Sequence, residues 1–395
     1  MTSLPPHTNK KVAVCRSRLL PLSETFIKEQ MLALKNWQGL LVGEQVLEDG
    51  LPLDGLKYHL YKKERQSFFA QQLQRVHNAL NLPSRPLIRL LKKLTPELIH
   101  VHFGTDATRL WPSIKQLQTP VVVTLHGYDI TTYKSFWKSH RSPRFKLYPE
   151  RLLAMAQDPR VHFIAVSEAI RQKAMEFGLP AKKITVKYIG IDTNKFKPGP
   201  IPINERELRI LFVGRLTEKK GIQYLLQAFN EVKNQVNGAR LVIAGDGPQM
   251  QEAQQYADSY NLPIDFLGSV SHERVRQEMN LATVFCLPSV TASNGDSEGF
   301  GMVLLEAQAC GVPVVTSAHG GATEGILHGE TGFAFTEKDV QALSQYLIQL
   351  LSDDELLCSM SDRAQRFVRE KFDIKQCTAE LEAYYDDVYV KFHQK

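Results

Sequence analysis

Two carboxylates and neighbouring glycines make residues 294–306 the most chemically informative part of the chain. Glu298 lies in a polar loop, and Glu306 lies eight positions on, inside an apolar run that favours a helix. If the helix begins near Gly301, its first turn carries N–H groups that lack partners, and the helix dipole is positive there. Such a helix start can bind an anion, and the glycine lets a ligand come close to the backbone.

The two carboxylates indicate which kind of ligand would fit. They are unsuited to a phosphate alone, whereas hydroxyl groups need hydrogen-bond acceptors of this kind. The stretch therefore favours a ligand that carries both an anionic group and hydroxyls, as a sugar linked to phosphate does. A helix cap with one buried, hydrogen-bonded glutamate explains this stretch equally well when it is taken alone.

A second group of residues could bind the same ligand. Gly214 and Arg215 end a predicted strand, and Lys219 and Lys220 precede a predicted helix. Arg can hold phosphate oxygens with two parallel hydrogen bonds, and Lys acts as a point charge. The glycine turn at 245–248 follows the next strand and could line a nucleotide, although each segment is also compatible with an ordinary surface loop. The chain has no Walker A loop and no GxGxxG after its first strand, which weakens a nicotinamide interpretation.

Histidines mark the first half of the chain. His126 follows an apolar strand and is expected at the carboxyl end of a parallel sheet, where ligands bind. It could donate a hydrogen bond to a reacting group or hold charge near it, and a structural role is equally compatible. His100 and His102 alternate along another strand and therefore share one face. No carboxylate or cysteine cluster completes a metal set around them, so we expect no metal site.

The elements that must position these residues follow an α/β pattern. Continuous apolar strands alternate with helices on both sides of a proline-rich segment near 194–204, which predicts two parallel-sheet domains joined by a linker. The expected strands lie at 11–15, 97–104, 120–129, 160–167, 184–190, 208–213, 240–244, 265–268, 283–287 and 312–316. Ser23 or Thr25 is the predicted N-cap of the first helix. The tail from 365 to 392 is predicted to be helical and to dock on the first domain.

Composition excludes several classes of protein. The chain has 395 residues, of which 43% are hydrophobic and 23% charged, enough for two globular domains. No apolar run is long enough to cross a bilayer, and the polar residues 1–11 lack the apolar core of a signal peptide. Five scattered cysteines without CxxC spacing indicate a reducing compartment. We therefore expect a cytoplasmic protein.

The net charge of +6 is concentrated in the first half. Residues 57–93 contain nine Lys and Arg against one acid, and residues 134–151 contain six against one. Residues 64–94 are also predicted to be helical and amphipathic, broken at Pro83 and Pro86. Such a surface could face nucleic acid, a polyanionic acceptor or an anionic membrane leaflet, and a merely solvated surface remains open.

Together these motifs resemble those of the retaining glycosyltransferases of family 4. The resemblance covers most of the chain and is densest from Gly214 to Gly332. The motifs that carry it are Gly214-Arg215-Leu216 with Lys220-Gly221, Gly245-Asp246-Gly247-Pro248, Glu298-Gly299-Phe300-Gly301 through Glu306, Gly311-Val312-Pro313-Val314-Val315, and Gly320-Gly321 with Glu324. It implies the GT-B fold, in which two Rossmann-like domains face each other across a cleft. The expected domains are 1–200 for the acceptor and 201–375 for the nucleotide sugar, with a C-terminal helix at about 376–395 returning to the first domain.

The resemblance also implies roles for individual residues. Arg215 and Lys220 would neutralise the diphosphate, Glu306 would accept hydrogen bonds from ribose hydroxyls, and Glu298 would meet the transferred sugar. The residues that it places at the donor are Arg215, Lys220, Gly245, Gly247, Leu267, Glu298, Gly299, Phe300, Gly301 and Glu306. The catalytic set that it implies is His126, Glu298, Arg215 and Lys220. No metal or other cofactor is expected, because the two cations do the charge work of a metal. A UDP-sugar is favoured over a GDP-sugar as the donor.

One segment departs from the family pattern. Many relatives have a Gly-Gly turn after the first strand, whereas residues 16–27 here read Arg-Ser-Arg-Leu-Leu-Pro-Leu-Ser-Glu-Thr-Phe-Ile. The end of this run resembles a branch of the family that builds bacterial cell-surface polysaccharides. The acceptor-side residues that this implies are Ser23, Glu24, Thr25, His102 and Asp129, with Asp129 orienting the His126 loop.

The resulting expectation is an enzyme that transfers a hexose, with retention, to a glycan or lipid-linked acceptor of exopolysaccharide or lipopolysaccharide. It would act as a monomer or weak dimer at the inner face of the cytoplasmic membrane, held there by its basic first domain, without a nucleic-acid partner. One alternative is a nucleotide-sugar epimerase on the same fold, which would need acids that we do not find at the anomeric side. The other is a non-catalytic module that binds anionic surfaces. The base, sugar, acceptor and linkage are not specified by the sequence.

Overall fold

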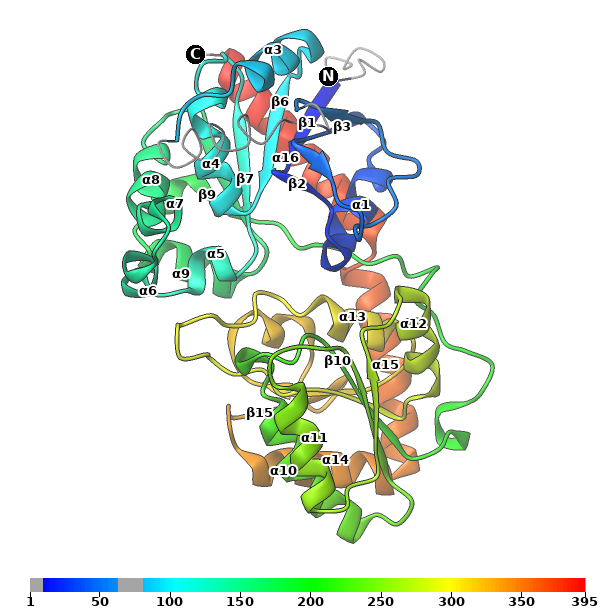
Figure 1. Ribbon diagram of the computed structural model, residues 1–395. Helices are drawn as coiled ribbons and strands as arrows, with labels where there is room; N and C mark the ends of the chain where they lie inside the picture. The colour runs from blue at the N-terminus through cyan, green and yellow to red at the C-terminus, as the bar shows by residue number, and fades with distance from the viewer. Residues whose placement is uncertain (1–9, 63–80, 395) are drawn as a thin grey trace. The chain divides into compact units, whose positions relative to one another are not determined.

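The structure, a computed structural model, describes residues 10–62 and 81–394 (Figure 1). The chain divides into two compact units, Met1–Gly190 with Ile374–Lys395, and Ile191–Asp373, which we call the first and the second domain. The first segment ends at Gly190 rather than at the predicted residue 200. The reason is that the proline-rich segment packs on the second domain, where Phe196 and Ile203 are buried.

The first domain is built on an all-parallel sheet of seven strands in the order β5-β3-β1-β6-β7-β8-β9. These strands are β1 (Lys10–Cys15), β3 (Trp37–Gly43), β5 (Tyr58–Leu60), β6 (Leu98–His102), β7 (Val121–Leu125), β8 (Val161–Ala165) and β9 (Ile184–Val186). A separate pair joins β2 (Arg18–Leu19) to β4 (Gln45–Val46). The parallel sheet confirms the fold prediction for this half, although β3 and β5 were not predicted.

Helices connect and cover these strands. They are α1 (Thr25–Ala33), α3 (Arg85–Leu94), α4 (Gly104–Ile114), α5 (Tyr128–Thr131), α6 (Lys134–Ser139), α7 (Pro143–Lys146), α8 (Tyr148–Met155) and α9 (Glu168–Glu176). The predicted N-cap of α1 is wrong, since the cap residue is Glu24, whose side chain makes no capping hydrogen bond within the described chain. Its carboxylate is instead paired with Arg16. Of the basic helix predicted at 64–94, residues 63–80 lie outside the described residues.

The last helix, α16 (Ile374–His393), belongs to the first domain, as the sequence predicted (Figure 1). Two buried polar contacts dock it there. The Tyr385 hydroxyl lies 2.6 Å from Nδ1 of His100. The Glu382 carboxylate accepts hydrogen bonds from three successive backbone N–H groups, those of Lys35, Asn36 and Trp37.

The second domain repeats the design with six parallel strands in the order β12-β11-β10-β13-β14-β15. These are β10 (Arg209–Val213), β11 (Arg240–Ala244), β12 (Ile264–Gly268), β13 (Val284–Leu287), β14 (Val314–Ser317) and β15 (Gly332–Phe335). Its helices are α10 (Ile222–Gln235), α11 (Met250–Ser259), α12 (His272–Leu281), α13 (Met302–Ala309), α14 (Val340–Ser352) and α15 (Asp354–Lys371). The single helical tail expected from 365 to 392 is in fact two helices, because α15 ends before Phe372.

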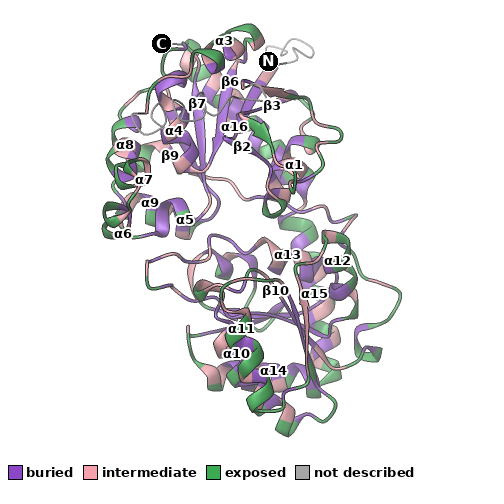
Figure 2. Ribbon diagram, in the orientation of Figure 1, coloured by how far each residue is buried: buried purple, intermediate pink, exposed green. Residues whose placement is uncertain are grey.

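The core of each domain lies along its sheet, where the strands are buried, while the helices expose their outer faces (Figure 2). In the middle of the second sheet, for example, Leu211, Val242 and Phe285 are at most 1% exposed. Strands buried on both faces are what a continuous apolar run predicts. Within the described residues, no helix is long and apolar enough to span a membrane.

Candidate active site

A short basic loop follows β10 in the second domain. The backbone turns at Gly214, passes Arg215, and forms the 3₁₀ helix η4 (Glu218–Lys220) before α10 begins. Gly221 ends η4 with a φ of +63°, and a Cβ there would lie 2.0 Å from the carbonyl oxygen of Pro288. Glycine is needed at this position because the loop after β13 packs directly against the backbone. The close approach brings the basic loop against the carboxylate-bearing loop.

Lys220 and Glu298 form the centre of the candidate site. The Lys220 Nζ lies 2.5 Å from an Oε of Glu298, and the two side chains are 15% and 12% exposed. The Ser289 hydroxyl donates a second, longer hydrogen bond of 3.3 Å to the same oxygen. Burial by itself would raise the pKa of Glu298, but Lys220 and Lys219 outweigh it and lower this pKa to about 2. Glu298 is therefore ionised at neutral pH, and its charge is matched by that of Lys220.

The neighbouring residues of η4 hold the same loop, a feature that the sequence analysis missed. The Glu218 carboxylate accepts hydrogen bonds of 2.8 Å from the N–H and from the hydroxyl of Ser293. Lys219 pairs with Asp296 at 3.1 Å. Three consecutive side chains of η4 thus contact three successive points along the loop that leads to Glu298. In the sequence, this contact is indicated only by the acid–base–base order of residues 218–220 and by the polar character of the loop. The two segments are about 75 residues apart, so no local pattern shows that they meet.

Arg215 is exposed, and it differs from the three residues of η4 in its contacts. Within the described chain it makes no ion pair or side-chain hydrogen bond. Its backbone carbonyl accepts a hydrogen bond from the N–H of Thr217, which fixes the turn. An Arg held on a tight turn with its guanidinium unpaired is available for an anionic ligand.

The glycine turn after β11 packs directly on the loop of Arg215. A Cβ at Gly245 would lie 1.9 Å from the carbonyl oxygen of Gly214, and one at Gly247 would lie 2.5 Å from that of Leu216. The turn also bonds to β12, since the Gly245 N–H donates to the carbonyl of Gly268 at 2.8 Å. Backbones at this separation exclude any side chain, so both glycines are needed for the two strand ends to meet. The predicted donor residue Leu267 is half-buried in β12, beside this turn.

The second carboxylate, Glu306, lies within α13, which starts at Met302 as predicted. Its cap residue Gly301 has a φ of +79°, and Glu306 itself is half-buried. A further glycine pair closes the site from another side. A Cβ at Gly320 would lie 2.6 Å from the carbonyl oxygen of Glu298, and the Gly321 N–H donates to that oxygen at 3.3 Å.

Phe300 and Gly299, also predicted to bind the donor, are buried next to Glu298. The Phe300 ring lies edge-on to Phe372, with 5.4 Å between their centroids. The predicted donor residues thus lie on β12, on α13 and on the loops after the strands of the second domain, and the Lys220–Glu298 contact joins two of these loops. For Glu306 and Leu267, the structure fixes the element that carries the residue but shows no direct contact with that pair.

In the first domain, His126 follows β7 and contacts His102, with 3.0 Å between His126 Nε2 and His102 Nδ1. As the alternation predicted, His100 and His102 share one face, and their ring centroids are 4.3 Å apart. Burial lowers the pKa of His100 to about 3. Burial first, and the positive charge of Arg16 among its neighbours, hold the pKa of His126 well below its usual range. Of the two roles predicted for His126, a neutral imidazole can act as the hydrogen-bond donor but cannot supply a positive charge near the reacting group.

Asp129 positions this histidine through the backbone. It is 0% exposed, and its carboxylate accepts hydrogen bonds from the N–H groups of Gly104, His126 and Gly127 at 2.8, 3.1 and 3.0 Å. The carboxylate therefore ties the loop after β7 to the start of α4. This geometry matches the expected orienting role and leaves no room for direct contact with an acceptor.

The other predicted acceptor-side residues divide by burial. Ser23 is exposed and Thr25 is half-buried, so both are accessible to a ligand. Glu24 is buried and paired with Arg16. His102 is 1% exposed and can influence an acceptor only through His126. For Glu24, His102 and Asp129 we therefore replace acceptor contact by a positioning role.

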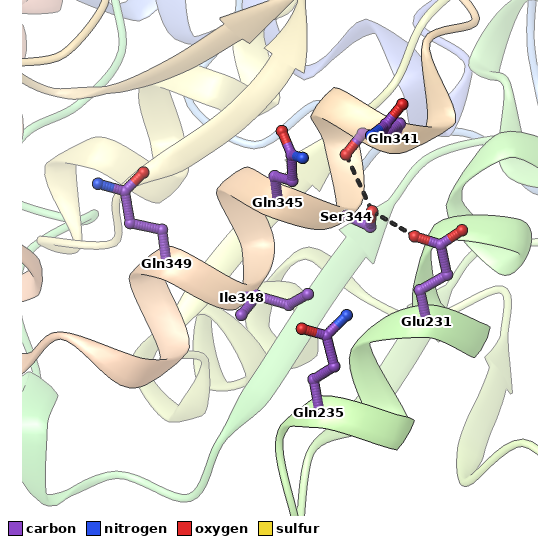
Figure 3. Close-up of a pocket in the computed structure, with 7 residues that line it drawn as sticks. All are labelled: Glu231, Gln235, Gln341, Ser344, Gln345, Ile348 and Gln349. Atoms are coloured by element: carbon purple, nitrogen blue, oxygen red, sulfur yellow. Dashed lines mark hydrogen bonds between the residues drawn. The ribbon is translucent and has the colours of Figure 1, made fainter.

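A cavity of about 360 Å³ lies elsewhere in the second domain, between α10 and α14 (Figure 3). Its lining is mostly polar and uncharged, and the Ser344 hydroxyl donates to Glu231 at 2.7 Å. The residues that line it are Glu231, Gln235, Gln341, Ser344, Gln345, Ile348 and Gln349. None of the predicted site residues is among them. No group of three or more potential metal ligands occurs in the described parts of the chain.

Two parallel-sheet α/β domains, with basic and acidic strand-end loops meeting in the second, define the class of two-domain GT-B glycosyltransferases. Comparison with known proteins identifies the family. A family model described as "Glycosyl transferases group 1" matches residues 193–367, and one described as "Glycosyltransferase Family 4" matches residues 59–195. The chain belongs to this glycosyltransferase family. This membership favours neither the epimerase nor the non-catalytic alternative.

Two relatives and one solved structure illustrate the match. WcaL of Escherichia coli K12, a glycosyltransferase assigned to colanic acid biosynthesis, is 30% identical over 71% of this chain and 68% of its own length. The amylovoran biosynthesis glycosyltransferase AmsK of Erwinia amylovora is 32% identical over 66% of this chain and 62% of its own length. The crystal structure of Anabaena HepE with UDP and glucose superposes with a TM-score of 0.77 at 19% identity, covering 96% of this chain and 100% of that one.

Proposed function

We propose that the protein transfers a hexose from a nucleoside diphosphate sugar to a hydroxyl of a glycan or lipid-linked acceptor, with retention at the anomeric carbon. The observation that carries this proposal is the contact of 2.5 Å between Lys220 and Glu298. The loop that leads to Lys220 also carries the exposed Arg215, which forms no ion pair within the described chain. A cation, a carboxylate and a free Arg on adjoining strand ends can serve a diphosphate and sugar hydroxyls together.

In the proposed reaction, the bond between the anomeric carbon and the phosphate oxygen breaks as the acceptor oxygen bonds to that carbon. The acceptor attacks from the side of the leaving group, and its proton passes to the departing diphosphate. Lys220 and Arg215 stabilise the negative charge that develops on this leaving group. Glu298 accepts hydrogen bonds from sugar hydroxyls once Lys220 turns to the phosphate. Because the two cations supply this stabilisation, we propose that no metal is needed.

In the first domain, we assign His126 to the reacting centre as a neutral hydrogen-bonding group. Its depressed pKa supports the neutral form, and its contact with His102 fixes the ring. Asp129 holds the loop in place through its three backbone contacts. Proton transfer to His126 would be costly at neutral pH, so the leaving diphosphate is the better final proton acceptor.

The names of the relatives support a role in building cell-surface polysaccharide. WcaL and AmsK are named for two exopolysaccharides, colanic acid and amylovoran. We propose a UDP-sugar as the donor, since the structural neighbour HepE was crystallised with UDP and glucose. Other relatives are named GDP-mannose-dependent, so this choice needs a direct measurement.

We also propose that the first domain binds an anionic membrane leaflet from the cytoplasmic side. The helix α3 exposes Arg85, Arg89, Lys92 and Lys93. Its apolar residues Leu87 and Leu91 are 1% exposed. The apolar side of α3 is therefore used within the domain, and the attraction that we propose is electrostatic rather than insertion of an amphipathic helix.

Substitution of two donor-site residues tests the proposed function. Lys220→Ala removes a charge from the leaving group, and Glu306→Ala removes the ribose acceptor. Each lost contact should cost about 2–4 kcal/mol in the transition state, which lowers transfer and donor hydrolysis roughly 30- to 1,000-fold. The controls are the exposed Arg240→Ala and Glu252→Ala. Near wild-type rates in both site variants contradict the proposal, and equal rates with and without EDTA are expected.

The donor itself is identified by thermal unfolding with a panel of nucleoside diphosphates. A ligand that binds only the folded state raises the melting temperature by mass action. UDP should raise it more than GDP at the same concentration, and the Lys220→Ala variant should lose most of the shift. A larger shift with GDP would leave the reaction class intact and correct the donor.

A further inference from the structure

Residues 16–27, which stand where the family resemblance led us to expect a Gly-Gly turn, contribute two side chains to a network of buried charge. The Arg16 guanidinium pairs with Glu24, and it also contacts Asp106 at 2.6 Å. Asp106 in turn accepts two hydrogen bonds of 2.8 Å from the N–H and the hydroxyl of Ser17. The side chains of these three charged residues are at most 9% exposed. Arg16, Ser17 and Glu24 are therefore held in place by buried ion pairs and hydrogen bonds.

A second charged group adjoins this network. Glu44, at the end of β3, contacts Arg109 at 2.7 Å and Lys62 at 2.8 Å. The side chains of all three are 14% or 15% exposed. Arg109 lies one turn after Asp106 on α4, so the two groups share one helix face. Glu44 thus forms ion pairs with two cations, and Asp106 likewise pairs with Arg16 and with one further Arg.

That further Arg, Arg144 of α7, is poorly satisfied. Its ion pair with Asp106 is long, 3.4 Å, and its guanidinium lies 4.9 Å from the ring of Phe145. Its Nε is buried and has no hydrogen-bond partner among the described residues. A buried donor without a partner costs free energy and calls for an explanation, such as a ligand or ion.

The network also carries an excess of positive charge. Its described cations are Arg16, Arg18, Lys62, Arg109 and Arg144, and its carboxylates are Glu24, Glu44 and Asp106. Arg18 is exposed, and its side chain forms no ion pair within the described chain. Burial first, and then the charge of Arg109, lower the pKa of Arg144. An anion between these guanidinium groups would satisfy the free donors and offset the excess charge.

The network lies at the carboxyl ends of strands in the same sheet that carries His126. Arg16 and Glu44 follow the ends of β1 and β3, and Arg16 donates to the carbonyl of His102 at 3.1 Å. His102 contacts His126 directly. In open parallel sheets, ligands bind beyond the carboxyl ends of the strands, which is where both the histidine and the charged network lie.

We propose that Arg144, together with Arg18 and Arg109, forms an anion-binding site for the acceptor, and that the acceptor carries a phosphate or carboxylate group there. This inference rests on the proposed function, because it names the substrate class of the first domain. A phosphate would come from the diphosphate that links a glycan to its lipid, and a carboxylate from an acidic sugar. Both chemistries suit the same guanidinium groups.

The test is a thermal-unfolding titration of the full chain with pyrophosphate and, separately, glucuronate. Saturating UDP blocks the donor site of the second domain. Both titrations are repeated in the Lys220→Ala variant. A shift caused by pyrophosphate, by glucuronate or by both is expected in both proteins, and the more effective anion identifies the source of the charge. The apparent affinity should fall about tenfold or more in Arg144→Gln and in Arg18→Gln, because each loses a charge-assisted contact.

Matched variants make the outcome decisive. Lys146→Gln removes an exposed charge from the same helix as Arg144 and should leave the shift unchanged. Arg18 is exposed, so Arg18→Gln reports on binding even if Arg144→Gln unfolds, and Arg144→Lys should retain part of the affinity. The proposal is overturned if neither anion shifts the wild type, or if the shift survives in both Gln variants. Stabilisation by UDP alone is measured in every variant, so failure of the donor site is recognised separately.

Discussion

At the scale of single residues, the opposite charges of Lys220 and Glu298 are paired at a distance of 2.5 Å. Under the proposed function, a diphosphate would take Lys220 away from this carboxylate before Glu298 could accept hydrogen bonds from the sugar. The two residues would therefore exchange partners: Lys220 would leave Glu298 for the diphosphate, and Glu298 would then bind the sugar hydroxyls. This exchange also means that part of the binding energy of the donor is used to separate the two charges.

Glu298→Gln should separate binding from catalysis. The amide keeps the shape of the side chain but lacks its negative charge and holds Lys220 less tightly, so we expect UDP to bind about three- to tenfold more tightly. Hexose transfer should fall at least about tenfold, because the sugar loses a charged acceptor. Calorimetry with UDP and an initial-rate assay measure the two effects, with the exposed Glu330→Gln as control. Unchanged or weaker UDP binding would contradict the exchange.

The buried histidines predict how stability depends on pH. The pKa of His100 is lowered to about 3, and those of His102 and His126 lie well below their ordinary value of 6.5. Below pH 6.5 the unfolded chain binds protons that the folded chain does not. The contribution of the neutral histidines to the free energy of unfolding should therefore be complete above pH 6.5. Below pH 6.5 the free energy of unfolding should decrease as the pH falls, by up to about 1.4 kcal/mol per pH unit for each histidine.

Denaturant unfolding from pH 7.5 to 5 measures this slope. His102→Gln should reduce the slope by about one proton, whereas His393→Gln, at an exposed position, should leave it unchanged. A wild-type free energy of unfolding that stays level from pH 6.5 to 5 would rule out the neutral histidine cluster.

The sequence predicts single residues well where a local pattern sets them. Alternation along one strand placed His100 and His102 on the same face, and the glycine before an apolar run located the start of α13. It could not predict that Lys220 touches Glu298, because that contact depends on the backbone packing of Gly221 against Pro288. Nor did it predict that Glu24 would be buried against Arg16 instead of facing a ligand.

At the scale of elements, η4 sets the register of the loop that carries Glu298. Glu218 and Lys219 act as positioning residues, since their side chains contact Ser293 and Asp296, which are not among the residues proposed to bind the donor. A loop held at several successive points by one helical turn can place a carboxylate with little freedom to move. Loops that present reacting groups gain from such support.

Glu218→Gln tests this positioning role. The amide weakens both bonds to Ser293, which are exposed, so we expect kcat to fall roughly two- to tenfold. The Kd for UDP should change less than about twofold, because Lys220 and Arg215 are untouched. Steady-state kinetics and calorimetry give the two values, and Glu205→Gln is the control. A variant that loses UDP affinity as much as kcat would show that η4 binds the donor instead.

Elements were predictable in proportion to their length and apolar continuity. The central strands of both sheets were expected, whereas β3, β5 and β15 were not. These three contain glycine or only three residues, and their pairing depends on neighbours far along the chain. The break between α15 and α16 also escaped prediction, since no glycine or proline marks it, and Phe372 is simply buried there.

At the scale of the whole molecule, the domain plan was predicted and one boundary was not. Alternating strands and helices on both sides of a proline-rich segment indicated two domains. That segment was interpreted as an interdomain linker, but it belongs to the second domain, and its residues Phe196 and Ile203 are buried. Whether a proline-rich stretch packs or spans solvent is decided by tertiary contacts that its composition does not encode.

The basic first domain predicts binding to anionic membranes. The full chain should float with vesicles that contain anionic lipid and remain unbound with neutral vesicles. Each exposed cation near such a surface contributes about 1 kcal/mol, so replacing Arg85, Arg89, Lys92 and Lys93 by Gln should abolish flotation. A charge-matched control replaces the exposed second-domain residues Arg240, Lys338, Arg366 and Arg369 by Gln. Equal flotation of the two quadruple variants would refute α3 as the contact.

The return of α16 to the first domain affects how the protein is made. On the ribosome, β1 to β9 emerge early, but residues 191–373 must be translated before α16 exists. Until then, the backbone at Trp37 and the ring of His100 lack Glu382 and Tyr385. Domains usually fold in the order of their synthesis. Here the first 190 residues are synthesised first, but we expect them to complete their folding only after α16 has been made. Chaperones should therefore bind this segment for longer than they bind residues 191–373.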